Sequence, residues 1–94
     1  MVYYSKTDYK LVKYEKSSTK NKKYNAVLEH KKTKKIIKIP FGDIRYSNYH
    51  DLTGLNLYTT HNDKKRRALY RARHRKDVRP GYYSPGWFSF NMLW

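Results

Sequence analysis

The acidic and imidazole side chains that could do chemistry lie in the middle of this sequence. They are Asp43, His50, Asp51, His61 and Asp63. Carboxylates and imidazoles hold hydrolytic metal ions and transfer protons in enzymes. These five follow no usual ligand spacing, and Asp63 and Asp51 suit a helix cap and a turn. Since the chain has no cysteine either, the sequence predicts no catalytic residue, no metal or other cofactor and no small-molecule substrate.

A second set of residues is cationic and predicts a different chemistry. The stretch HNDKKRRALYRARHRKD covers residues 61–77, and eight lysines or arginines stand against two aspartates between 63 and 77. Asn62 or Asp63 can cap a helix that runs from 63 to 77, and Pro80-Gly81 ends it. Such a helix spreads its charge over about 20 Å, the scale of several phosphates. The residues predicted to contact phosphates are Lys64, Lys65, Arg67, Arg71, Arg75 and Lys76.

The opposite face of this helix is expected to pack. It combines Asp63, Arg66, Tyr70, Arg73 and His74, with Leu69 and Ala72 as its apolar edge against a sheet. We expect Tyr70 to point inward, held by Arg66, Arg73 or the Phe41-Gly42 turn. A lone histidine such as His74 is more typical of a packed or hydrogen-bonded side chain than of a metal ligand.

Composition limits the partners. With 94 residues and a net charge of +15, the chain makes one domain with a small core. Charge this dense repels itself unless a polyanion or an acidic partner neutralises it, so nucleic acid is the first candidate, before an anionic membrane or an acidic protein. No apolar run could span a bilayer, and the N-terminus lacks the apolar core of a signal peptide. We therefore expect a protein with no transmembrane segment that is not secreted.

The elements that must position these residues indicate an α+β fold. Runs rich in Tyr, Val and Ile at 8–16, 23–30 and 34–42 predict a small three-stranded antiparallel meander. In the third run, Ile37, Ile39 and Phe41 share one face at period two. An ordered connection leads from it to the basic helix, and an aromatic helical turn ends the chain. Residues 1–21 are expected to form a basic N-terminal arm or an edge strand, and residues 22–94 a single small α+β domain.

The C-terminal stretch GYYSPGWFSFNMLW is the most apolar part of the chain. Ser84 followed by Pro85 is typical of a helix N-cap with proline in the first turn. The large side chains that follow predict a last helical turn or a strand: Trp87, Phe90, Met92, Leu93 and Trp94. Such a tail must be buried, and we expect it to complete the core of this chain and not to dock into a neighbouring protein.

Three ordered motifs carry a resemblance to a known family. They are FGD with YSNY, then DKKRRALYRARH, then SPGWFSFNMLW. In this order they resemble a family of small basic proteins of nucleocytoplasmic large DNA viruses, over residues 22–94. Arg67 replaces a lysine of the pattern, and Phe88 separates Trp87 from the serine. The matching residues are Phe41, Gly42, Tyr46, Asp63, Arg66, Tyr70, Arg73, His74, Trp87, Leu93 and Trp94. The family has no assigned activity, so the resemblance implies a viral source and no mechanism.

Together these features predict a non-enzymatic, strongly basic viral protein that binds nucleic acid by sequence-independent phosphate contacts, with genomic DNA as the first candidate and RNA as the alternative. The helix has no side chains placed to read adenine and no helix-turn-helix or zinc-finger context. Such a protein would be packaged in the virion or act inside the infected host cell. The alternative is a minor capsid or cementing protein, whose partners are capsid proteins. Salt separates the two, because phosphate binding weakens steeply with ionic strength.

Overall fold

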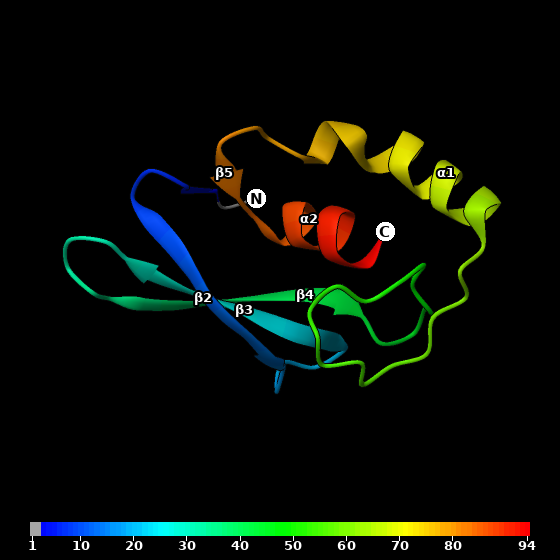
Figure 1. Ribbon diagram of the computed structural model, residues 1–94, viewed down its shortest axis with the longest axis horizontal. Helices are drawn as coiled ribbons and strands as arrows, with labels where there is room; N and C mark the ends of the chain where they lie inside the picture. The colour runs from blue at the N-terminus through cyan, green and yellow to red at the C-terminus, as the bar shows by residue number, and fades with distance from the viewer. Residues whose placement is uncertain (1–2) are drawn as a thin grey trace.

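The computed structural model describes residues 3–94; Met1 and Val2, the first residues of the segment 1–21, lie outside the described residues. It has a three-stranded antiparallel sheet, a basic helix and a C-terminal helical turn, which confirms the predicted α+β fold (Figure 1). The elements, in chain order, are β1 (Tyr4–Ser5), β2 (Tyr9–Lys16), β3 (Lys22–His30), β4 (Ile36–Asp43), α1 (Lys64–His74), the 3-10 turn η1 (Arg75–Asp77), β5 (Tyr82–Tyr83), α2 (Pro85–Phe88) and the π-helical turn η2 (Ser89–Leu93).

The sheet has the order β2-β3-β4 and buries its central strand. Tyr24, Ala26 and Leu28 alternate along β3 and are fully buried. Their partners on β4 are Phe41, Ile39 and Ile37, the three residues that the period-two pattern placed on one face. Alternation sends successive side chains to opposite faces, so these six residues form one apolar layer.

The C-terminal segment covers this layer, which confirms that the tail completes the core of the chain itself. Figure 1 shows α2 and η2 lying between the sheet and α1. The Ser84 hydroxyl accepts the Trp87 amide and so caps α2, with Pro85 in the first turn, as predicted. Phe88 is fully buried and stacks on Phe41 with ring centroids 5.4 Å apart, and Leu93 is buried in the same cluster.

Gly42 is required where this tail meets the sheet. Its φ is +77°, a conformation that side-chain-bearing residues rarely adopt. A Cβ at this position would lie 3.0 Å from Leu93 Cδ1 and 3.2 Å from Lys23 Cβ. The glycine thus lets Leu93 pack directly onto the end of β4.

The N-terminal strands enclose the other end of the core. β1 pairs antiparallel with β5, and β2 is an edge strand that pairs with β3 from Tyr9 to Lys16. The junction of residues 21 and 22 lies at the turn between β2 and β3, so the described part of the segment, residues 3–21, is continuous with the sheet. Within residues 3–94, no helix has both the length and the apolar character needed to cross a bilayer.

Candidate functional site

α1 begins where the sequence predicted. The Asp63 carboxylate accepts hydrogen bonds from the amides of Lys65 and Arg66 and so satisfies two free donors of the first turn. The α-helix ends at His74, and η1 continues it as a 3-10 turn to Asp77. The predicted span 63–77 is therefore helical except for its capping residue.

The inner face of α1 differs from the prediction. Leu69 and Ala72 do not pack against the sheet; both are exposed, and Leu69 is 58% exposed. Arg67 and Arg71 are predicted to project outward to phosphates. Instead both turn toward the tail, and Arg67 also contacts the loop between β4 and α1. The helix lies on the C-terminal turn and not on the sheet, so a different stripe of side chains faces inward (Figure 1).

Arg67 and Arg71 hold the tail by hydrogen bonds and ring contacts. Arg67 Nε donates to the carbonyl oxygen of Trp94 at 2.7 Å, and its guanidinium lies 4.8 Å from the centre of the Tyr49 ring. Arg71 Nη1 donates to the carbonyl oxygen of Phe90 at 3.3 Å, with its guanidinium 4.0 Å from the Phe90 ring centre. A planar guanidinium can donate and stack at once, which explains why arginine replaces aliphatic residues here.

Tyr70 points inward, as expected, but its partners are different. Its ring stacks on Trp94 at 4.2 Å with an interplanar angle of 5°, and on His74 at 4.2 Å and 28°. Two nearly parallel rings this close must cover opposite faces of Tyr70. Burial raises the pKa of the Tyr70 hydroxyl above its ordinary range. His74 is a packed histidine and also lies 2.9 Å from Asp77 Oδ2 through its Nδ1.

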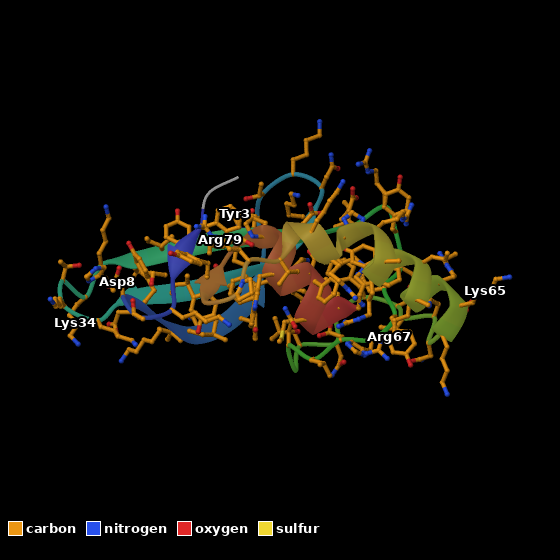
Figure 2. The ribbon with its side chains drawn as sticks, turned by 90° about the horizontal axis from the view of Figure 1, so that it is seen from above. Tyr3, Asp8, Lys34, Lys65, Arg67 and Arg79 are labelled. Carbon is orange, nitrogen blue, oxygen red and sulfur yellow. The ribbon has the colours of Figure 1, made fainter. Side chains whose placement is uncertain are left out.

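The outward side of the helix carries free charge. We call Lys64, Lys65, Arg75 and Lys76 the outer cationic face; all four are exposed. Figure 2 shows Lys65 extending away from the body at the start of α1. None of these four side chains forms an ion pair within residues 3–94. Four of the six predicted phosphate contacts therefore project to solvent.

A cavity of about 570 Å³ separates α1 from the end of the sheet, and we call it the α1 cavity. Arg66, Leu69 and Arg73 border it from the helix, a third stripe between the inner and outer faces. Lys22, Gly42 and the segment 43–48 form the opposite side, and Ser89, Leu93 and Trp94 of the tail complete it. It combines apolar surface with three cations outside any ion pair of the described residues.

Eight of the eleven residues that carry the family resemblance line this cavity: Gly42, Tyr46, Arg66, Tyr70, Arg73, His74, Leu93 and Trp94. The other three have structural places. Phe41 is in the core, Asp63 caps α1, and Trp87 lies beneath the Lys6 ammonium, which is 4.1 Å from its ring centre. Residues far apart in sequence thus meet at one site.

Sequence reasoning missed Lys23, which organises one wall of the cavity. Its side chain is buried, and Nζ donates to the carbonyl oxygen of Tyr46 and to Asn48 Oδ1, each at 2.6 Å. Burial lowers the pKa of this ammonium below its ordinary range. Nothing in the sequence indicates that Lys23 is buried. Alternation places it on the opposite face of the strand from Tyr24, but it does not show that another segment covers that face.

The five residues considered for catalysis make separate structural contacts and do not form one site. Asp43 forms a two-pronged pair with Arg45, which lowers the pKa of its carboxyl to about 2. Asp51 accepts hydrogen bonds from Tyr24 and Thr53, and Asp63 caps the helix. His50 and His61 flank the Tyr49 ring, and burial lowers the pKa of both imidazoles. Within the described part of the chain, no three acidic or imidazole side chains meet as a metal site would need.

The site therefore has two parts, an exposed cationic face and an adjoining cavity with apolar and cationic walls. The first can attract phosphates at a distance, and the second can enclose a small group. Comparison of the chain with models of protein families, with curated proteins and with solved structures found no match.

Proposed function

We propose that this protein binds nucleic acid without reading its sequence, through contacts between the outer cationic face and backbone phosphates. The observation that carries the proposal is the uncompensated charge of the outer cationic face, whose four side chains are exposed and have no ion-pair partner among residues 3–94. Exposed lysines hold mobile point charges, which suit phosphates and not base edges.

The acidic residues of the chain support this interpretation, because six of the seven have another partner. Glu15, Glu29 and Asp43 form ion pairs with lysine or arginine, Asp77 lies 2.9 Å from His74, Asp51 accepts from Tyr24 and Thr53, and Asp63 caps α1. The seventh, Asp8, lies at the end of the molecule opposite Lys65 (Figure 2). An external polyanion is therefore the natural counterion for this helix.

In the viral setting that the resemblance implies, the partner is genomic DNA and the place of action is the virion. The protein acts there by charge neutralisation and not by catalysis. A minor capsid or cementing role is the competing hypothesis; it needs an acidic or apolar protein surface in place of phosphates.

A pair of charge-matched variants tests the proposal. The first changes Lys64, Lys65 and Lys76 to Gln on the outer cationic face. The control changes Lys32, Lys34 and Lys35 to Gln around the turn between β3 and β4. Each variant lowers the net charge by three, and all six lysines are exposed. We expect the helix variant to flatten the dependence of log Kd on log salt by nearly one unit per lost contact, and the control to change it much less.

Measurements with two unrelated duplexes across a salt series decide the outcome. If both variants flatten the salt dependence of Kd equally, binding depends on the net charge of the protein and not on the outer cationic face. An affinity for nucleic acid that does not change with salt, or no binding at all, would refute phosphate recognition. Salt-resistant retention on purified particles would then favour the capsid hypothesis.

A further inference from the structure

One aromatic residue at the α1 cavity has an exposed ring. Four of the residues that line the cavity carry rings, namely Tyr46, Tyr70, His74 and Trp94. Tyr70 is enclosed between His74 and Trp94, and His61 lies 5.1 Å from the Trp94 ring centre. Tyr46 packs against no other ring among residues 3–94 and is 63% exposed. A planar ligand entering the cavity would therefore meet Tyr46.

The backbone of Tyr46 is fixed although its side chain is exposed. The buried Lys23 ammonium donates to the Tyr46 carbonyl and to the Asn48 side chain, and the Tyr46 amide donates to the Asp43 carbonyl at 3.2 Å. The Arg45 guanidinium lies 5.8 Å from the Tyr46 ring centre and pairs with Asp43. A large ring held out on an anchored backbone loses little freedom on binding, which favours a recognition role.

Arg66 and Arg73 lie across the cavity from this ring. They are seven residues apart on α1, which places them on one face about 10.5 Å apart along the axis. This spacing is that of the backbone positions, and the long arginine side chains can converge from it onto two different phosphates, one on each side of a nucleotide. Leu69 lies between them and is 58% exposed, so the surface between the two cations is apolar.

We infer that the α1 cavity holds one unpaired base, stacked on Tyr46, while Arg66 and Arg73 contact the phosphates on either side of it. The inference rests on the proposed function and deepens it by naming a single-stranded or unstacked nucleotide as the preferred ligand. A cavity of about 570 Å³ lies within the range of small-ligand sites, roughly 300 to 1,000 Å³. Bases within a duplex are already stacked and cannot enter.

The test compares three probes: an oligothymidine of about 12 nucleotides, an abasic strand with the same number and spacing of phosphates, and a blunt duplex of that length. The oligothymidine should bind on the order of tenfold more tightly than the abasic strand, which is the size of one stacking contact. Tyr46→Ala should remove that ratio, while Tyr46→Phe, which keeps the ring, should retain it.

A second pair of variants tests the cavity without changing Tyr46, so it controls for an indirect effect of the Tyr46 substitutions on the fold. Leu69→Glu places a charge at the cavity, and Ala68→Glu places the same charge one residue away on the exposed side of α1. Both positions are exposed, so neither change should impair folding. We expect Leu69→Glu to reduce the ratio of oligothymidine to abasic affinity, and Ala68→Glu to weaken both probes alike.

The outcomes distinguish this inference from the proposal beneath it. Equal affinity for oligothymidine and the abasic strand, with a steep salt dependence, would overturn the base site and leave phosphate binding intact. A ratio that survives Tyr46→Ala would also overturn it. Absence of salt-dependent binding to any of the three probes would overturn both.

Discussion

Tyr24 offers the sharpest test of how this small core is held together. Its side chain is fully buried, and its hydroxyl donates to Asp51 Oδ2 and accepts the Leu57 amide at 3.1 Å. These bonds connect the centre of the sheet to the irregular segment between β4 and α1. Tyr24→Phe removes both while leaving the ring in place.

The expected cost follows from the groups left behind. A hydrogen bond to a charged group contributes about 1.5 to 3 kcal/mol, and a donor left without a partner costs about 1 to 3 kcal/mol if it stays buried. Asp51 keeps its hydrogen bonds from Thr53, which limits the loss. We expect Tyr24→Phe to lower the free energy of unfolding by roughly 2 to 4 kcal/mol, measured by urea denaturation at neutral pH.

Tyr14 supplies a matched control in the same core. Its ring lies 5.9 Å from Phe41, and its hydroxyl oxygen is buried with no hydrogen-bond partner among the described residues. Because Tyr14→Phe removes a polar group that makes no bond, it should leave stability unchanged or raise it by about 1 kcal/mol. The same substitution thus has opposite expected signs at two neighbouring positions.

Alkaline pH gives an independent measurement of the same groups. Burial, together with the bond to Asp51, raises the pKa of Tyr24 from 10.0 to about 12, and burial raises that of Tyr14 to about 12. Between pH 10 and 12 the unfolded chain loses each proton before the folded chain does, so stability falls as pH rises. For Tyr24 the fall is roughly 3 kcal/mol, at about 1.4 kcal/mol per pKa unit. Each Phe variant should lack the part of this pH-dependent loss of stability that comes from the tyrosine it replaces.

The reasoning would be refuted if Tyr14→Phe destabilised the fold as much as Tyr24→Phe, since the two hydroxyls would then be equivalent. It would also be refuted if both variants lost stability above pH 10 as steeply as the parent protein. Native near-ultraviolet spectra at neutral pH would establish that each variant is folded before its stability is compared.

Three other changes have defined outcomes. Deleting residues 87–94 should abolish cooperative thermal melting, because the tail covers the sheet; a near-native melt would contradict this. Tyr70→Ala should cost about 2 kcal/mol in denaturant unfolding, because the ring is stacked on both faces, and unaltered stability would exclude that role. Lys23→Met should change global stability little but speed amide hydrogen exchange at residues 44–48, and unchanged exchange would show that the buried ammonium does not anchor them.

The sheet and the helix boundaries were predictable from local patterns. Alternation at Ile37, Ile39 and Phe41 identified the core face of β4, since a strand exposes every second side chain to the same side. Asp63 identified the start of α1 because a carboxylate in that position satisfies free amides. These features depend on residues a few positions apart, which the sequence displays directly.

The inner face of α1 was not predictable for a physical reason. Its contacts are arginine to carbonyl, arginine to ring and ring to ring, between segments about 20 residues apart or more. Such contacts leave no hydrophobic period, so the sequence predicts Leu69 and Ala72 as the buried edge, whereas both are exposed. The burial of Lys23 and the α1 cavity depend on the same long-range packing. The predicted set of tail residues also omits Phe88, although its side chain is fully buried.

The arrangement around α1 separates folding from binding on a single helix. Arg67, Tyr70 and Arg71 secure the tail, Arg66 and Arg73 border the cavity, and the side chains of the outer cationic face are exposed without an ion pair among residues 3–94. Neutralising Arg67 or Arg71 would therefore weaken the fold, and any loss of binding would follow from that. The lysines of the outer face make no contact that the fold needs, so their charges repel one another without structural compensation. An acidic or phosphate-bearing partner would supply the missing negative charge, and this is the role that the proposed function gives to nucleic acid.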